Sequence, residues 1–516
     1  MKNKRIKVFP VVDVFAGPGG LGEGFAAYID QRGSRRFQNS VSIEKEPFPH
    51  QTLLLRHFFR SFENEVPEEY YQYLKGEITR EQLYTLFSEQ YHEAEQSAHC
   101  VELGPKSHDH VRKLISSKLT DDSPWALVGG PPCQAYSLVG RSRMMNDPKF
   151  KKDERHFLYR EYLRIIADHR PPVFVMENVK GLLSAKVGAE QVIRLIINDL
   201  SRPEAALNGG DGNLEYKLYS LASDDRIEQD ADPREFLVKA EEFGVPQARH
   251  RMFILGIRSD CHAIPAQLVR HEAPSVKQTI SHLPKIRSTL SREQDSAERW
   301  LDTIAGIESA DRGAANGPKE TRNVWRQIRT TLNTPMEWPE QTKSHSCRKG
   351  QKSNHPALLY MLDDRLTFLT GHEARGHMAS DLHRYFFAAN FAEVMQRSPT
   401  LSDFPESLLP HHRNVIEGRE GRMFSDRFRV QLAGSVSTTI TSHISKDGHY
   451  FIHYDPLQCR SFTVREAARL QTFPDNYKFE GPRTEQYHQV GNAVPPYLAS
   501  QIAAIVCDVL EQIARR

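Results

Sequence analysis

Cysteine is scarce in this 516-residue sequence: there are six, none in a Cys-x-x-Cys pair and none grouped with histidine at zinc spacing. This scatter argues against a disulfide framework and a structural zinc site, and it favours a reducing compartment. No run of eighteen apolar residues occurs, and no long apolar stretch follows the basic residues 1–5. Since a membrane span and a secretion signal both need such stretches, we expect a cytoplasmic protein that contacts no membrane.

An excess of either charge is also missing. The chain carries 68 Lys and Arg against 66 Asp and Glu, a net charge of +2. A strongly basic, histone-like binder is excluded, but a nucleic-acid enzyme is not, because it needs positive charge only along one cleft. The Gly-Lys-Ser/Thr of a phosphate-binding loop is absent, which disfavours ATP as a ligand. The length suits one large domain with a second one, or one domain with large insertions.

The first half of the sequence alternates between strand and helix patterns. Residues 8–15 are apolar and rich in β-branched side chains, Gly17-Pro18-Gly19-Gly20 follows, and residues 21–28 have helical character. The further strands that we expect are residues 41–43, 126–128, 173–176 and 252–257, with helices over 158–167 and within 60–120. This order predicts an α/β fold with a doubly wound, mostly parallel Rossmann-like sheet. Residues 204–214 are predicted to form an exposed loop.

The second half has a different character. Between residues 260 and 435 the periodicity weakens, and His, Arg, Ser and Asn dominate. Residues 438–442 and 449–453 look like two strands joined by an Asp-Gly turn, and residues 464–470 and 494–509 look helical. We therefore expect a catalytic domain over residues 1–259, completed by 455–516, and a smaller mixed domain over 260–454. Alternatively, the polar region is a solvated insertion.

Glycines that follow the first strand suggest a ligand site. A glycine turn between a strand and a helix lets the backbone approach a ligand closely. Such turns also serve as plain tight turns and in nucleotide-dependent oxidoreductases. Glu44, at the end of the next expected strand, strengthens the ligand interpretation, because an acid there can bind both ribose hydroxyls of a nucleoside-like cofactor.

Three further segments carry reactive or charged side chains next to expected strands. Cys133 follows Gly129-Gly130-Pro131-Pro132 at the carboxyl end of a strand, where doubly wound sheets build their sites. Glu177 emerges from an apolar strand, as either a structural hydrogen-bonding group or an acid whose pKa is raised by burial. Arg249 and Arg251 alternate along an extended segment and would face the same side, toward the site or toward solvent.

Together these segments resemble the ordered motifs of the DNA cytosine C5-methyltransferase family, in its usual unpermuted order. The motifs cover about three fifths of the chain: residues 13–20, Pro131-Pro132-Cys133-Gln134, Glu177-Asn178-Val179, Gln247-x-Arg249-x-Arg251, residues 465–474 and Gln489-Val490-Gly491-Asn492-Ala493-Val494.

The resemblance implies a catalytic role for each motif. Cys133 would add, as a thiolate, to C6 of cytosine, and Glu177 would protonate N3. Asn178 would orient the loop, Arg251 would hold the cytosine O2, and Arg249 would lie near the loop of the nucleophile. The sequence does not indicate which base removes the C5 proton.

The resemblance also implies that S-adenosylmethionine is the cofactor, with no metal ion. The residues assigned to its pocket are Asp13, Phe15, Ala16, Gly17, Gly19, Gly20, Leu21, Glu44, Pro131, Asn492 and Val494. The acidic contact to the adenine ring stays open between Asp109, Glu102 and a residue near Asp121.

Double-stranded DNA is the implied partner, because a cytosine must leave the base stack to reach a buried cysteine. Residues 260–454 would be the target-recognition domain. We expect a bacterial, nucleoid-associated enzyme that acts as a monomer on DNA, in a restriction-modification or related defence system with a separate endonuclease. The alternatives are a tRNA cytosine C5-methyltransferase, whose relatives tend to be more compact, and a catalytically silent DNA-binding regulator.

Overall fold

A computed structural model describes most of the chain. The residues described are 7–63, 65–119, 123–132, 158–187, 190–208, 212–223, 232–310, 319–334, 337–346, 353–410, 415 and 425–515. Cys133 and the region around Asp121 therefore lie outside the described residues.

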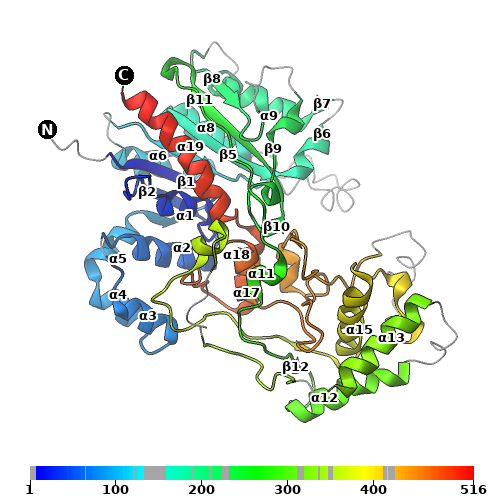
Figure 1. The fold of residues 1–516 in the computed structure, drawn as a ribbon. Coiled ribbons are helices and arrows are strands. Elements are labelled where there is room, and N and C mark those ends of the chain that lie inside the picture. Colours follow the sequence, from blue (N-terminus) through cyan, green and yellow to red (C-terminus); the bar gives the residue numbers. More distant parts are fainter. Residues whose placement is uncertain are drawn as a thin grey trace.

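A central sheet organises the first half of the chain (Figure 1). Its strands lie in the order β3-β2-β1-β4-β5-β11-β8, and β9 pairs with β11. Strand β11 runs antiparallel to its three partners β5, β8 and β9, whereas β1 to β5 are parallel. The bounds are β1 Phe9–Val14, β2 Phe37–Glu44, β3 Ala98–Cys100, β4 Ala126–Gly129, β5 Val173–Val179, β8 Tyr216–Tyr219, β9 Leu237–Lys239 and β11 His250–Arg258. The predicted α/β, doubly wound sheet is confirmed.

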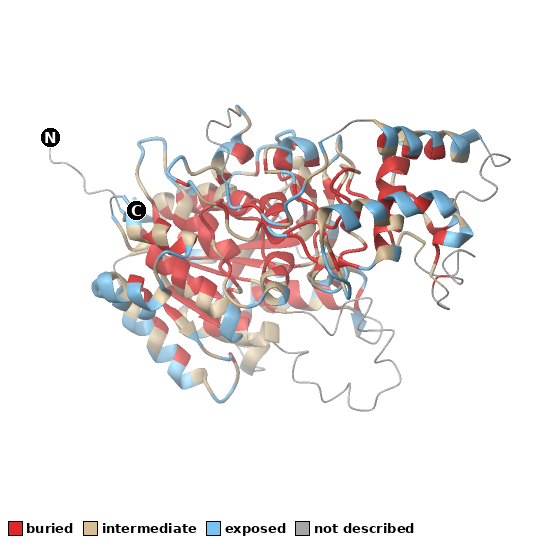
Figure 2. Cartoon of the chain, turned by 90° about the horizontal axis from the view of Figure 1, so that it is seen from below, coloured by how far each residue is buried: buried red, intermediate tan, exposed pale blue. Residues whose placement is uncertain are grey.

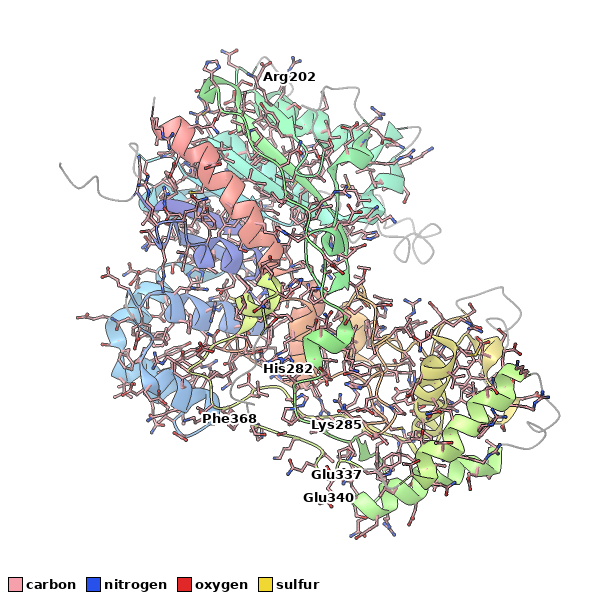
Figure 3. All side chains as sticks on the ribbon, in the orientation of Figure 1. Arg202, His282, Lys285, Glu337, Glu340 and Phe368 are labelled. Carbon is pink, nitrogen blue, oxygen red and sulfur yellow. The ribbon has the colours of Figure 1, made fainter. Side chains whose placement is uncertain are left out.

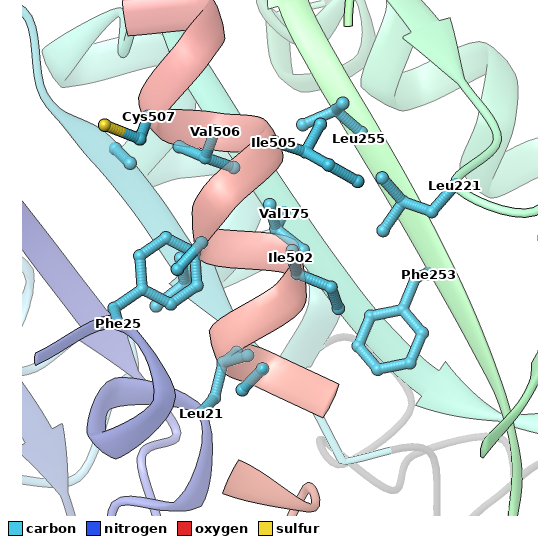
Figure 4. Close-up of a cluster of buried hydrophobic side chains, with 14 of the residues drawn as sticks. Leu21, Phe25, Val175, Leu221, Phe253, Leu255, Ile502, Ile505, Val506 and Cys507 are labelled. Carbon is cyan, nitrogen blue, oxygen red and sulfur yellow. The ribbon is translucent and has the colours of Figure 1, made fainter. Parts of the chain in front are cut away.

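Helices cover both faces of the sheet, which explains why its strands are apolar at consecutive positions. Val11, Val128 and Val175 point to the face covered by α1 (Gly20–Ala27) and α19 (Pro496–Ala514). Figure 4 shows Ile502 and Ile505 of α19 lying over this face, with Phe25 of α1 beside them. The alternate strand positions point to the other face, covered by α6 (His108–Lys118), α8 (Leu158–His169) and α9 (Val192–Ser201).

A group of helices between β2 and β3 is less peripheral than its polar sequence suggests. The helices are α2 (Pro47–Arg60), α3 (Glu68–Lys75), α4 (Arg80–Leu86) and α5 (Ser88–Glu95). Their inner aromatic side chains, such as Tyr70, share one apolar core with α17 (Val464–Leu470) and α18 (Arg483–Asn492). The carboxyl-terminal segment therefore packs both on the sheet and on this insertion.

A separate lobe has its own core, formed around Trp300, Trp325 and Phe386. It consists mainly of α12 (Ala297–Ala305), α13 (Lys319–Asn333) and α15 (Ala379–Met395). In Figure 2 the buried residues of this lobe form a patch at the end of the molecule, beyond the larger buried core of the sheet. His282 and Lys285, labelled in Figure 3, lie where the chain passes from the sheet-bearing part toward this lobe.

Short elements complete the described fold. The helices are α10 Pro203–Asn208, α11 Val276–Ile280 and α14 Pro356–Met361, and the strands are β6 Lys186–Val187, β7 Glu190–Gln191, β10 Gln247–Ala248, β12 Thr289–Leu290, β13 Gly376–His377 and β14 Ser437–Thr438. The 3-10 helices are Lys180–Ser184, Pro233–Phe236, Ala240–Glu242, Ser259–Cys261, Gly306–Ala310, Leu401–Asp403, Glu406–Leu408 and Ser442–Ser445.

Two local predictions are wrong. Residues 438–442 and 449–453 do not form a hairpin: β14 pairs in parallel with β10, and a 3-10 helix over Ser442–Ser445 follows it. Gly448 has a φ of 77°, as a turn requires. Ile440, however, is hydrogen-bonded to the side chains of Gln247 and Arg249 and not to a partner strand. The predicted loop at 204–214 is also partly wrong, because α10 extends to Asn208.

One segment, Arg483–Ala514, is long and apolar enough to span a membrane by length and composition. It comprises α18 and α19, and 78% of its most apolar window is buried inside the fold. The apolar side chains of α19 pack on the central sheet. Its hydropathy is therefore that of a core helix.

Candidate functional site

A cavity of about 660 Å³ lies at the carboxyl ends of β1, β2, β4 and β5. Parallel α/β sheets place ligands at this edge, where loops from several strands converge. The predicted site residues that line it are Asp13, Phe15, Ala16, Gly17, Leu21, Glu44, Pro131, Glu177, Asn178, Arg251, Asn492 and Val494. Gly19, Gly20 and Arg249 are not among its lining residues, and Cys133 lies outside the described residues.

The glycine turn after β1 is held open by its backbone conformation and by Glu44. Phe15 and Gly17 have φ values of 57° and 58°, in the left-handed region that costs a non-glycine residue free energy. The backbone N–H groups of Gly17 and Glu46 each donate to one carboxylate oxygen of Glu44, both at 2.8 Å. Glu44 therefore ties the turn to the end of β2 and keeps its carboxylate at the cavity.

Asp13 is an unusual acid for this position. Its side chain is buried, and its Oδ2 atom has no hydrogen-bond partner in the structure. The pKa of Asp13 is raised to about 8: burial raises it most, the hydrogen bond with the backbone of Gly22 lowers it, and the neighbouring Glu44 raises it. A buried, unpartnered carboxyl at a cavity is a candidate contact for a polar or cationic ligand group.

Glu177 and Arg251 form an ion pair across two neighbouring strands. Arg251 Nε lies 3.0 Å from Glu177 Oε1, because antiparallel pairing of β11 with β5 brings the two side chains to one edge. Burial raises the pKa of Glu177, and the guanidinium groups of Arg251 and Arg249 counteract part of this rise. The pair can therefore present a protonated carboxyl and a cation together to one ligand.

Asn178 connects this acid to the proline-rich segment. Its Nδ2 donates to the carbonyl oxygen of Pro131 at 3.2 Å, and its Oδ1 accepts from the backbone N–H of Val179 at 2.8 Å. The amide thus fixes the end of the described segment that leads to Cys133. This contact is consistent with the predicted orienting role.

Arg249 is fully buried behind the cavity. It donates to the carbonyl oxygens of Ile440 at 2.9 Å and Gly491 at 3.1 Å. These contacts tie the strand that carries Arg251 to two distant segments of the chain.

The carboxyl-terminal segment closes the cavity against the glycine turn. A methyl group added to Gly20 would lie 2.4 Å from the carbonyl oxygen of Val494 and 3.1 Å from Cβ of Ala493. The two segments are therefore in direct contact, which only a glycine allows. Asn492 and Val494 line the cavity beside this contact.

Several lining residues were missed in the sequence. They are Pro18, Ile43, Lys45, Glu46, Pro49, Val101, Leu103, Gly130, Pro132, Leu158, Val179, Glu485, His488, Gln489 and Ala493. Pro18, Pro132, Val179, Gln489 and Ala493 lie within the predicted motifs, and others directly adjoin them, so proximity in sequence was the available signal. Residues 101–103 reach the cavity through β3, the short strand whose pattern went unrecognised. Of the named candidates for the adenine contact, Glu102 lines the cavity and Asp109 does not.

Known proteins are similar to this sequence along most of its length. The family of C-5 cytosine-specific DNA methylases matches residues 80–203 and 234–507. The Type II methyltransferase M.Bpa9945I of Bacillus paralicheniformis is 33% identical over 527 residues, which cover 97% of this chain and 99% of the relative.

Two more distant relatives agree with this match. The Type II methyltransferase M.DdeI of Desulfomicrobium norvegicum is 26% identical over 75% of this chain and 73% of its own length. The DNA (cytosine-5-)-methyltransferase M.ApeKI of Aeropyrum pernix is 27% identical over 78% of this chain and 85% of its own. The chain therefore belongs to the C-5 cytosine-specific DNA methylase family and is a DNA (cytosine-5-)-methyltransferase.

Proposed function

We propose that this enzyme transfers a methyl group from S-adenosylmethionine to C5 of a flipped cytosine in a specific DNA sequence, through a covalent bond between Cys133 and C6. The observation that carries the proposal is the shared cavity. The glycine turn after β1 and the Glu177–Arg251 pair line one space of about 660 Å³. Such a space can hold a cofactor and an extrahelical base side by side.

The residues at one end of this cavity fit the proposed cofactor. Glu44 keeps free lone pairs beyond its two backbone hydrogen bonds, as needed for ribose hydroxyls. Asp13 lines the same end of the cavity, with its Oδ2 against Gly22 of α1. When bound, S-adenosylmethionine supplies an electrophilic methyl group on its sulfonium.

The other end fits the chemistry of the base. Carbon 5 of cytosine is a weak nucleophile, so the Cys133 thiolate would first add to C6 and form a carbon–sulfur bond. Addition places electron density on N3, which would take a proton from Glu177, while Arg251 would hold O2. Once C5 carries the methyl group and has lost its proton, β-elimination breaks the carbon–sulfur bond and releases Cys133.

Residues 260–454 are proposed to recognise the DNA. This region includes the lobe of α12, α13 and α15, which has a core of its own. The relatives named as Type II methyltransferases support a role in a restriction-modification system, with a separate endonuclease as partner. The enzyme would act on DNA as a monomer.

One substitution tests the covalent step. The Cys133→Ser variant should lose methyl transfer to DNA while its affinity for S-adenosylhomocysteine stays nearly unchanged. Wild-type enzyme should form a stable adduct with duplex DNA that contains 5-fluorocytosine, because no proton can leave C5, and the variant should not. The matched control is Cys100→Ser, an exposed cysteine that does not line the cavity. Full activity of Cys133→Ser would contradict the mechanism.

The substrate is tested separately. DNA from cells that express the chain, sequenced after bisulfite treatment, should show 5-methylcytosine in one recurrent sequence. Labelled cofactor offered with duplex DNA or with tRNA should label the DNA. Labelling of tRNA alone would support the alternative substrate.

A further inference from the structure

A closed ring of buried hydrogen bonds lies behind the cavity and contains none of the reacting groups. It joins β10, the residue after α17, the second residue after β14 and the end of α18. Figure 1 shows β10, α17 and α18 converging at the centre of the molecule. Its three side chains, those of Gln247, Arg249 and Gln471, are each at most 1% exposed.

One half of the ring passes through two glutamine amides. The Nε2 atom of Gln471 donates to the carbonyl oxygen of Ala493. Its Oε1 atom accepts from Nε2 of Gln247 at 2.5 Å, and Oε1 of Gln247 accepts from the backbone N–H of Ile440 at 2.8 Å. Every polar atom of both amides is thus used within the interior.

The other half of the ring passes through one arginine. Arg249 donates from one nitrogen to the carbonyl of Ile440 and from another to the carbonyl of Gly491. Ile440 is therefore held at both its N–H and its carbonyl. Asn492, which lines the cavity, lies between the two residues, Gly491 and Ala493, whose carbonyls the ring binds.

The ring has consequences for both ends of the cavity. Gln247 and Arg249 lie four and two residues before Arg251 on one extended segment, so the ring fixes the position from which Arg251 reaches Glu177. The same bonds fix the wall at Asn492 and Val494. Neither end can shift without breaking buried hydrogen bonds, which costs free energy because no water can replace them.

We propose that Gln247, Arg249 and Gln471 are positioning residues that couple the cofactor pocket to the base pocket, so that cofactor and DNA each strengthen the binding of the other. This inference rests on the proposed function, since it assumes that the two ends of the cavity hold these two ligands. Such coupling is reciprocal, because the free energy of binding both ligands does not depend on the order in which they bind.

Binding measurements with Gln471→Met test the coupling. The quantity is the dissociation constant of S-adenosylhomocysteine for the full chain, with and without a duplex that carries the sequence found by bisulfite sequencing. We expect DNA to tighten binding by about tenfold in wild type and by less than about twofold in the variant, within the range of known couplings. Gln471→Glu keeps the acceptor for Gln247 but places an acceptor against the Ala493 carbonyl, and should lose the coupling as well.

A matched control separates coupling from stability. Asn390 in α15 is also a fully buried amide with two hydrogen bonds, to Thr331 at 2.9 Å and to the Phe386 carbonyl at 2.8 Å, but lies in the core of the lobe. Asn390→Leu should lower the melting temperature as Gln471→Met does and leave the coupling at its wild-type value.

The outcomes also separate this inference from the proposed function. If wild-type enzyme methylates no cytosine in DNA, the proposed function fails. If it methylates DNA but DNA does not tighten cofactor binding, or if both Gln471 variants keep the wild-type coupling, the ring proposal alone is overturned. Loss of coupling in Asn390→Leu to the same degree would also overturn it.

Discussion

Arg251 Nε lies 3.0 Å from Glu177 Oε1 across the strand pair β11–β5 and opposes the effect of burial on this carboxyl. Burial favours the neutral carboxyl, and the guanidinium favours the carboxylate. Burial prevails, so the pKa of Glu177 lies above its ordinary value. The arginine nevertheless limits this rise in the pKa of Glu177.

The pH profile of methyl transfer should report this balance. If protonated Glu177 donates to N3, activity falls as pH rises through its pKa. Replacing Arg251 by Met removes the group that lowers this pKa, so the alkaline limb should move to higher pH. The rate should also fall by about 10²- to 10³-fold because the cytosine O2 loses its partner. The measurement is kcat/KM against pH.

Arg251→Lys is the control for this prediction, because it keeps the positive charge. Its alkaline limb should stay nearer the wild-type position although its rate falls. If the alkaline limb of the Arg251→Met profile stays in place or moves to lower pH, Glu177 is not the acid that donates a proton to N3.

Asp13 should make the stability of the enzyme depend on pH. Its pKa is about 8 in the folded chain, mainly through burial, against 3.8 ordinarily. Between these values the folded state binds the extra proton, so this stabilising contribution is complete below pH 3.8 and is lost as pH rises toward 8. The loss amounts to about 1.4 kcal/mol per pH unit. In Asp13→Asn this dependence should be absent.

Urea unfolding at pH 5 and pH 8 measures the effect. The stability of Asp13→Asn relative to wild type should increase with pH. Asp109→Asn, outside the cavity lining, should show the same difference from wild type at both values. A constant difference for Asp13→Asn would mean that Asp13 is ionised in the folded chain.

Local patterns in the sequence were sufficient to predict β1, β2, β4, β5 and β11 of the sheet and much of the cavity lining, but not β3, β8 and β9. β1, α1, β4 and β5 combine apolar runs with glycine or proline turns, and these signals do not depend on the rest of the chain. Helices α12 and α13 were missed although Trp300 and Ile304, and Val324 and Ile328, have helical spacing. Because polar residues dominate the surrounding region, this apolar spacing was not recognised.

Other features depend on contacts that are distant in sequence. The 438–453 hairpin was predicted from a turn signal, but the side chains of Gln247 and Arg249 hold Ile440 elsewhere. Those contacts span more than 190 residues. Alternation along a strand predicted a shared face for Arg249 and Arg251, yet only Arg251 lines the cavity, because α18 and Ile440 bury Arg249.

Gly20→Ala should weaken cofactor binding. The added Cβ would lie 2.4 Å from the Val494 carbonyl, so the carboxyl-terminal wall must move away from the glycine turn. Overpacking of this kind costs about 1–3 kcal/mol, which corresponds to about a 5- to 150-fold loss of affinity if it falls on the bound state. Isothermal titration with S-adenosylhomocysteine measures it. Gly104→Ala, whose Cβ would meet nothing within 4 Å, should bind as wild type does. Equal affinities of all three proteins would show that the wall is free to shift.

Glu23 should be among the most sensitive residues for stability. It lies on α1, fully buried, and accepts from Arg56 at 2.6 and 2.7 Å and from Arg60 at 3.3 Å. Burial alone would raise the pKa of Glu23, but the two arginines outweigh it and lower the pKa to about 2. Glu23→Gln leaves the buried Arg56 and the partly exposed Arg60 without their shared anion, and should cost about 3–5 kcal/mol at pH 7.

The stability that Glu23 contributes depends on pH in the opposite direction to the stability that Asp13 contributes. The stabilising contribution of Glu23 is complete above its ordinary pKa of 4.5 and is lost as pH falls through about 2. The gap between wild type and Glu23→Gln should therefore narrow between pH 5 and pH 3, as measured by urea unfolding. Glu68→Gln, which removes an exposed partner of Lys75, should change stability by less than about 1 kcal/mol. A Glu23→Gln variant as stable as this control would show that Arg56 and Arg60 keep their charges by other contacts, and that α1 does not depend on this ion pair to hold the glycine turn at the cavity.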